Sequence, residues 1–412
     1  MRRIERAGLR APARVLDIGL PRADGSSDVL DVTGIHSLWC LTREHGVPTG
    51  ISFWDVSDDR TVRLSDIVDA EMRDAGGTHG TAASAGVGDP PGIGLTVAIC
   101  TRDRPDGLRR ALASLRDQTD RGFSLVVAEN APSSDAGADV VAGARLPRCS
   151  YVIEPRPGLS HTRNTALSRV GTEYVAWMDD DEVMDPRWIE QIKAGFAHPS
   201  RPAAVCGVML PAELETQAQV HFEQYGGFNK GRTLAPEVLV AGSPLVRSPL
   251  YPLPAIGSGG NMAFRTASLR DAGGFDPCLG AGTRTHGGEE TRVFAVLLRS
   301  GHTVLHWPSA IAWHYHRRDD EALRRQFYGY GAGLSAFYAS MIRSDPRVVI
   351  ELLGLVPQML RDLGLGSGGR RTEEVPADFP PSLLRASRNG LLTGAWLYVR
   401  EAVSQRAGRT TR

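Results

Sequence analysis

Short apolar runs alternate with amphipathic segments from residue 95 onward. The apolar runs predict four strands, at 95–100, 123–130, 149–155 and 173–178. Between the first two, Leu108, Leu112 and Leu115 recur at helical spacing, which predicts a helix with one apolar face. This β-α-β order predicts an α/β fold with a mostly parallel sheet flanked by helices. In such open sheets, ligands bind at the carboxyl ends of the strands.

Changes in composition divide the chain into four parts. Residues 1–75 carry short β-like runs and one helical pattern, and predict a small α+β accessory module, with an extension of the next domain as the alternative. Residues 76–94 are rich in Gly, Ala, Ser and Pro and predict a linker. The α/β pattern fills 95–320, and a helical C-terminal region fills 321–412.

The end of the chain is basic. From 361 to 412 there are nine arginines against five acids, a net charge of about +4. We expect helices that pack on the core, with peripheral membrane contact through apolar faces and arginines as the alternative. No run of 18 apolar residues predicts a spanning helix, and the start of the chain lacks the apolar core of a signal peptide.

Overall composition excludes some classes of function. Lys+Arg and Asp+Glu both number 47 in the 412 residues, so net charge does not argue for a nucleic-acid partner. The five cysteines are dispersed and form no CxxC pair, which argues against a zinc knuckle or a disulfide framework. A reducing cytoplasmic location is therefore expected.

Four acids, "DDDE" at 179–182, directly follow the fourth predicted strand. An EF-hand is excluded, because Val183 and Met184 stand where that loop needs an oxygen ligand and a glycine. In extended chain Asp179 and Asp181 project to one side, roughly 6–7 Å apart between Cα atoms. They could hold a Mg²⁺ or Mn²⁺ ion whose coordination shell is completed by substrate phosphates. A solvated turn is the alternative.

Two further segments carry candidate chemistry. "GGEETRVFAVLLRSGH" places Glu289 and Glu290 at the start of an amphipathic helix, either as a general base beside an acceptor or as acids that complement the helix dipole. "AIAWHYHR" ends a strand with His314 and His316, which alternation puts on one side and which are candidate metal ligands.

Five segments in this order resemble the family 2 glycosyltransferases, which have the GT-A fold. The resemblance covers about 95–318 and lies in these segments: "TVAICTRDRPDGLRRALASL", "VVAENAPSSD", "RPGLSHTRNTAL…YVAWMDDDE", "GSGGNMAFRTASLRDAGGFD" and "GGEETRVFAVLLRSGH…AWHYHR". Asp179 and Asp181 match the DxD motif of the family.

The resemblance implies a role for each matching residue. The implied donor-nucleotide residues are Thr101, Arg102, Arg104, Glu129, Arg163, Asp179 and Asp180. Glu129 stands where the family usually has aspartate. Alternation predicts that Asp180 and Glu182 point away from the site. The implied metal ligands are Asp181, His314 and His316, and the implied acceptor loop contains Gly259, Gly260 and Asn261. Glu290 would be the catalytic base, and Glu289 would orient the acceptor.

The family's reaction is inverting transfer from a nucleoside-diphosphate sugar to an acceptor hydroxyl, with Mn²⁺ or Mg²⁺. A UDP-sugar is favoured as donor, and the acceptor would be a glycan, a lipid-linked glycan or a small molecule. The alternatives are a nucleotide-sugar-binding protein without activity and a metal-dependent phosphotransferase. No P-loop or GxGxxG follows a strand, which argues against an ATPase or a dehydrogenase.

Overall fold

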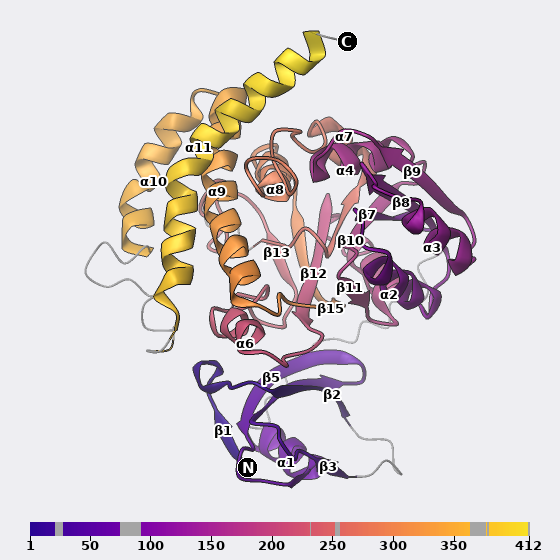
Figure 1. Ribbon diagram of the computed structural model, residues 1–412, viewed down its shortest axis with the longest axis vertical. Coiled ribbons are helices and arrows are strands. Elements are labelled where there is room, and N and C mark those ends of the chain that lie inside the picture. Colours follow the sequence, from indigo (N-terminus) through magenta and orange to yellow (C-terminus); the bar gives the residue numbers. More distant parts are fainter. Residues whose placement is uncertain are drawn as a thin grey trace.

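The structure is a computed structural model that describes residues 1–20, 28–74, 92–230, 232–251, 256–362, 376 and 379–410. Residues 76–91 of the linker predicted at 76–94 lie outside the described residues. Figure 1 shows a small N-terminal part below a larger α/β domain, with long helices along one side of that domain.

The N-terminal part is a small α+β unit. Its four-stranded sheet has the order β1-β5-β4-β2, and β3 pairs with β6. Its elements are β1 (Arg2–Ile4), η1 (Arg6–Gly8), β2 (Ala13–Leu20), β3 (Val29–Asp31), β4 (Ser37–Glu44), β5 (Val47–Asp55), β6 (Thr61–Arg63) and α1 (Leu64–Asp74).

The central sheet has the order β11-β15-β12-β14-β10-β7-β8-β9, and β13 pairs with β15. Its strands are β7 (Leu95–Thr101), β8 (Phe123–Asn130), β9 (Cys149–Glu154), β10 (Tyr174–Asp179), β11 (Glu182–Met184), β12 (Ala204–Pro211), β13 (Glu237–Leu239), β14 (Met262–Arg265) and β15 (Val304–His314). Strands β10, β7, β8 and β9 run parallel, as do β12 and β15. The predicted α/β class with a mostly parallel sheet is confirmed.

Helices cover both faces of this sheet because successive strand residues point to opposite sides. Val97 and Ile99 of β7 pack with the predicted apolar face of α2, while Ala98 packs with helices of the opposite layer. The first layer contains α2 (Pro105–Arg116), α3 (Ala136–Ala144) and α5 (Trp188–Phe196), and the second contains α4 (Leu159–Ser168), α7 (Thr266–Asp271) and α8 (Glu289–Arg299). Helix α6 (Gln217–Gln224) lies beside the N-terminal part.

Long helices follow the sheet, namely α9 (Asp320–Ser344), α10 (Val348–Asp362) and α11 (Pro381–Thr410). Helices α9 and α11 pack at very short range through glycines. A Cβ at Gly390 would stand 2.1 Å from the Tyr328 carbonyl oxygen, and one at Gly394 would stand 2.0 Å from that of Ala332. Within the described residues, no helix is both long and apolar enough to span a bilayer.

The N-terminal part shares a hydrophobic cluster with the α/β domain. Leu9 and Trp39 pack in it with Val208 and Ile311. An ion pair at 2.7 Å between Arg43 and Asp185 adds a polar contact across the same boundary. These contacts cross the predicted boundary, and the accessory module at 1–75, with an extension of the domain as the alternative, stays a prediction.

Candidate active site

The acid cluster is the tight turn between β10 and β11. Asp179 ends β10, Glu182 begins β11, and the Glu182 carboxylate accepts from the Asp179 backbone N–H at 3.0 Å. Strand β11 pairs with β15 so that Glu182 lies opposite His314, and the Tyr315 N–H donates to the Asp181 carbonyl at 3.0 Å. Strand pairing therefore brings the end of "AIAWHYHR" beside the DxD motif.

Neighbouring acids of the turn face different surroundings. Asp180 is buried, and it accepts from the Thr101 hydroxyl at 2.7 Å and from Arg104 at 2.8 Å. Asp179 and Asp181 instead line a large cavity. The alternation expected from the sequence is therefore visible, with Asp180 directed away from the cavity toward the end of β7.

Asp181 and His314 form a pair that could hold a cation. The Asp181 Oδ1 atom lies 3.5 Å from the His314 Nε2 atom. Burial alone would raise the pKa of Asp181, but the interaction with His314 and the charges of Arg317 and Arg104 outweigh it and hold that pKa well below its usual range. In the described part of the chain, no three His, Cys, Asp or Glu side chains gather as a metal-binding group. The pair fits an ion such as Mg²⁺ or Mn²⁺, which needs only one or two protein ligands beside substrate phosphates.

His316 is engaged on both ring nitrogens. Its Nδ1 lies 2.8 Å from the His314 Nδ1, and its Nε2 lies 3.1 Å from Glu223. The other Glu223 oxygen accepts from the Trp39 indole N–H at 3.0 Å. A buried hydrogen-bonded chain therefore runs from the N-terminal part to His314. Because both His316 nitrogens have protein partners, His314 is the histidine available to a cation beside Asp181.

Arg163 connects the DxD motif to the "GGEE" motif. The side chain is almost fully buried, and it lies 3.0 Å from Glu289, 3.0 Å from the Gly259 carbonyl and 3.5 Å from Asp179. Its guanidinium also lies 5.2 Å from the centre of the Phe275 ring. Arg163 is therefore a buried residue of the site and not an exposed charge on the outer surface of its helix. Sequence reasoning did not anticipate that Arg163 also pairs with Glu289, 126 residues away.

The two adjacent glutamates are in different environments. Glu289 is buried against Arg163, and its Oε2 atom has no hydrogen-bond partner among the described residues. Burial and the neighbouring charge of Glu290 raise the pKa of Glu289 to about 8, against the opposing charge of Arg163. Glu290 lines the cavity and is only half-buried. Both stand in the first turn of α8, as the sequence predicts.

The "GSGGNM" loop packs its backbone directly on the site. A Cβ at Gly260 would lie 1.7 Å from a Glu182 oxygen, and one at Gly259 would lie 3.0 Å from Arg163. Both glycines line the cavity. Glycine is required at 260 because any side chain would displace the buried Glu182 carboxylate.

Asn261 is a correction to the sequence-based site. Its side chain is fully buried, accepts from the Trp188 indole N–H at 2.8 Å, and donates to the carbonyl oxygens of Val208 (2.8 Å) and Ala310 (2.9 Å). These three bonds occupy the amide in the core. Asn261 therefore joins three segments of the domain and is unavailable to an acceptor.

The remaining residues predicted for the donor lie along the same sheet edge but do not line the large cavity. Thr101 and Glu129 are side by side, because β7 and β8 pair in that register. The Glu129 carboxylate accepts from Tyr151 at 2.5 Å, and Arg102 is exposed. Their roles toward a nucleotide stay predictions.

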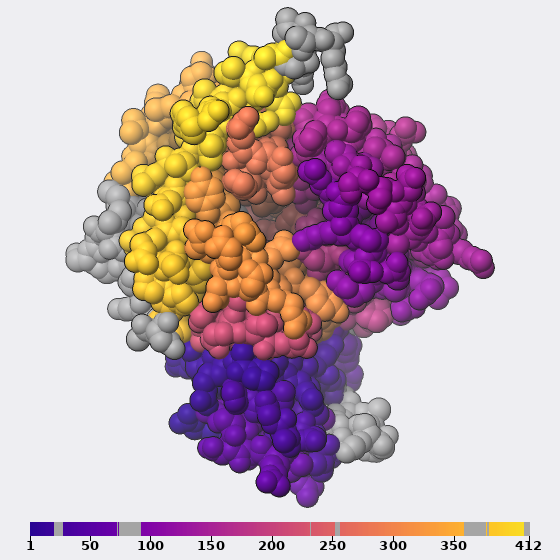
Figure 2. Space-filling view, in the orientation of Figure 1, coloured from indigo at the N-terminus to yellow at the C-terminus, as the bar shows by residue number. Residues whose placement is uncertain are grey.

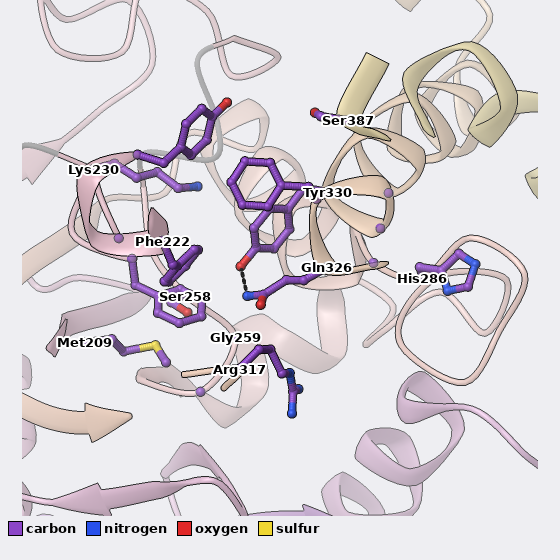
Figure 3. A pocket seen from close by; sticks show the side chains of 18 of the residues that line it. Met209, Phe222, Lys230, Ser258, Gly259, His286, Arg317, Gln326, Tyr330 and Ser387 are labelled. Atoms are coloured by element: carbon purple, nitrogen blue, oxygen red, sulfur yellow. Dashed lines mark hydrogen bonds between the residues drawn. The ribbon is translucent and has the colours of Figure 1, made fainter. Parts of the chain in front are cut away.

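A cavity of about 1090 Å³ joins these motifs. Figure 3 shows part of its lining, including the Gln326 amide that donates to the Tyr330 hydroxyl at 2.5 Å. Several lining residues were missed from the sequence, namely Glu5, Arg6, Phe222, Lys230, Arg317, Gln326 and Tyr330. Arg317 directly follows "HYH" and could have been proposed from that position. The others come from segments that carry no motif.

The pKa of Glu289 predicts a pH-dependent stability. Its buried carboxyl faces Arg163 of α4, Asp179 of β10 and Glu290 on its own helix. Between its ordinary pKa of 4.5 and about 8, the folded protein keeps a proton that the unfolded chain loses. Stability due to this group therefore falls as pH rises, by up to about 1.4 kcal/mol per pH unit. We expect the melting temperature of Glu289→Gln minus that of the wild type to increase from pH 5 to pH 8. Calorimetry of both proteins at each pH measures this difference. A constant difference over this range would contradict the raised pKa.

Comparison with known proteins gives a family match. The model described as "Glycosyl transferase family 2" matches residues 96–271. The pre-mycofactocin glycosyltransferase of Mycobacterium tuberculosis is 25% identical over 279 residues, which cover 66% of this chain and 54% of that protein. The chain thus spans about half the length of the curated relatives it matches.

Two of the similar solved structures have low sequence identity to this chain. The mannosyltransferase PcManGT from Pyrobaculum calidifontis, in complex with GDP-Man and Mn²⁺, has a TM-score of 0.45 and 18% identity, with 77% of this chain and 75% of that chain covered. TarS from S. aureus has a TM-score of 0.41 and 15% identity, with 74% and 55% covered. The match over residues 96–271 confirms the family predicted from the motifs: this part of the chain is a glycosyl transferase family 2 domain.

Proposed function

We propose that the protein transfers a sugar from a nucleoside-diphosphate sugar, with a UDP-sugar favoured, to an acceptor hydroxyl with inversion of the anomeric centre. The observation that carries this proposal is the single cavity lined by Asp179 and Asp181 of the DxD turn, by Arg163, and by Glu289 and Glu290. An acidic turn for the diphosphate end and an acidic helix start for the acceptor thus face the same space.

Asp181 and His314 would hold a divalent cation, whose charge offsets the negative charge that develops on the leaving diphosphate. Arg163 presents a buried positive charge between the two acidic motifs and supports the position of Asp179. Arg317, which lies 3.5 Å from Asp181 and lines the cavity, adds a second cation at the diphosphate end. These groups stabilise the leaving group without a covalent intermediate.

Glu290 is the base of the proposed reaction. Its carboxylate takes the proton of the acceptor hydroxyl while the acceptor oxygen forms a bond to the anomeric carbon. The bond from that carbon to the diphosphate oxygen breaks, and the diphosphate leaves with the electron pair. Attack from the face opposite the leaving group inverts the centre. Glu289 is less suited to this step, because its carboxylate is buried against Arg163.

Ligand-dependent melting tests the donor part of the proposal. We expect one nucleoside diphosphate with Mn²⁺ to raise the melting temperature, because a ligand at 100 times its dissociation constant stabilises by about 2.7 kcal/mol. Nucleoside diphosphates and nucleotide sugars are screened at millimolar concentration with and without Mn²⁺. The nucleotide that gives the largest metal-dependent shift identifies the donor base.

Two neighbouring substitutions provide the control for this screen. Asp181→Asn is expected to remove the part of the shift that depends on Mn²⁺. Asp180→Asn is expected to keep it, because Asp180 faces Thr101 and Arg104 rather than the cavity. Equal effects of the two variants, or no stabilisation by any nucleotide, would contradict the proposed donor site.

The cellular setting is part of the same proposal. A cytoplasmic location agrees with five dispersed cysteines that are all free. Peripheral contact at the inner face of the membrane would take place through the C-terminal region. The acceptor, whether a glycan, a lipid-linked glycan or a small molecule, is left to experiment.

A further inference from the structure

Helix α11 exposes a continuous apolar face. Leu392, Trp396, Val399 and Val403 are spaced four, three and four residues apart, which places them on one side of a helix over about 17 Å. Their exposed fractions are 82%, 58%, 56% and 62%. Figure 2 shows α11, in yellow, along the outer surface of the helical layer.

The opposite face of α11 fixes this orientation. Gly390 and Gly394 lie in direct backbone contact with α9, and no side chain fits between the two helices there. The Tyr398 hydroxyl donates to Asp276 at 2.9 Å, which ties the same buried face to the α/β domain. The helix therefore cannot rotate its apolar residues inward without losing these contacts.

The charges on α11 are almost all positive. Its sequence holds five arginines and a single acid, Glu401. That acid is half-buried and lies 3.4 Å from Arg284. Arg385 is exposed about two turns before the apolar face, and Arg400 is exposed within it, with its guanidinium 4.7 Å from the centre of the Trp396 ring.

We propose that this face of α11 docks on an anionic lipid surface. An apolar face bordered by arginines binds such a surface by burying its side chains at the headgroup boundary while the arginines contact the lipid phosphates. Trp396 has the amphipathic ring that prefers this boundary. A second copy of the chain is a poorer occupant, because pairing two such faces would oppose arginines to arginines.

Docking would also position the cavity. Ser387, Arg388 and Leu391 of the same helix line the large cavity. The lipid-facing side of α11 and the cavity wall are thus parts of one rigid helix, so binding of the helix holds the cavity close to the bilayer. The docking surface itself does not depend on the proposed reaction, and its test requires no substrate.

Vesicle sedimentation of the full chain tests the proposal. We expect the protein to pellet with vesicles of equal phosphatidylglycerol and phosphatidylcholine, and to remain in solution with phosphatidylcholine alone. Leu392→Ser with Val399→Ser, and separately Arg385→Glu with Arg400→Glu, should each weaken binding by about tenfold or more. In the wild type, brominated lipid should quench the fluorescence of Trp396, and Trp396→Phe should remove that quenching.

Matched variants elsewhere on the surface separate docking from general effects. Arg109→Glu with Arg116→Glu changes the net charge by the same amount but on α2, where these side chains are 63% and 61% exposed. Ile153→Ser with Leu245→Ser removes apolar side chains that are 48% and 53% exposed. Both should bind like the wild type, and thermal melting checks that every variant is folded.

Three results would overturn the proposal. The first is equal binding to neutral and anionic vesicles, and the second is unchanged binding of both α11 variants. The third is a dimer, seen by light scattering, that dissociates when Leu392→Ser is combined with Val399→Ser. The last result would assign the face to a second copy.

Discussion

Replacing Glu290 with glutamine is expected to slow release of the nucleoside diphosphate from the donor sugar by about 10²–10⁴-fold, while nucleotide binding is retained. Glutamine keeps the shape of the side chain but cannot take the acceptor proton, and general base catalysis contributes this range. The donor used is the nucleotide sugar that gives the largest melting shift. Its turnover is followed as released diphosphate, with transfer to water as the minimal reaction.

Two controls separate the base from general damage to the site. The melting shift by the nucleoside diphosphate should be the same in Glu290→Gln and in the wild type, because Glu290 lies at the acceptor motif. Glu321→Gln, on the exposed start of α9, should leave turnover unchanged. If Glu290→Gln turns over at the wild-type rate, another group takes the proton. A full loss in Glu289→Gln alone would then indicate that Glu289 is the base.

The largest effect on stability is expected from Arg163→Met. At pH 9, above the pKa of about 8 of Glu289, methionine fills much of the space but leaves Asp179 and Glu289 buried without the cation that lies 3.5 Å and 3.0 Å from them. Removing one partner of a buried ion pair typically costs about 3–5 kcal/mol, because the remaining charge is uncompensated. The midpoint of guanidinium chloride unfolding measures the loss.

A double variant tests whether the loss has this electrostatic cause. Arg163→Met combined with Glu289→Gln removes both a cation and an anion, so it should be less destabilised than the sum of the two single variants. Arg116→Met removes an exposed arginine and should change stability by no more than about 0.5 kcal/mol. Simple additivity of Arg163→Met and Glu289→Gln would mean that packing, rather than charge, holds Arg163 in place.

Local sequence patterns predicted four strands of the central sheet, at 95–100, 123–130, 149–155 and 173–178, and the helix that follows the first of them, because each depends on neighbouring residues. The spacing of Leu108, Leu112 and Leu115 requires only a 3.6-residue period, and all three are buried in α2. The position of the acid turn also followed from a strand that ends in carboxylates. Alternation correctly separated Asp180 from Asp179 and Asp181, since direction along an extended chain is a local property.

Spacing alone could not show what each site residue contacts. Asn261 stands in a loop motif beside the site, yet its amide bonds to Trp188, Val208 and Ala310 in the core. Glycines 259 and 260 were expected near an acceptor, and they pack on Arg163 and Glu182 as well. These contacts depend on how separate elements are packed, which no periodicity encodes.

The sequence by itself determined the α/β class, the family and the identity of the acidic motifs, because these follow from local periodicity and from ordered short segments. Only the tertiary structure decided that Arg163 joins the two motifs, that His314 rather than His316 faces Asp181, and that Trp39 supports Glu223 behind them. It also decided which face of α11 meets solvent. The physical reason is that these contacts join residues far apart in the chain, whose distances are set only when the sheet, its helices and the N-terminal part pack together.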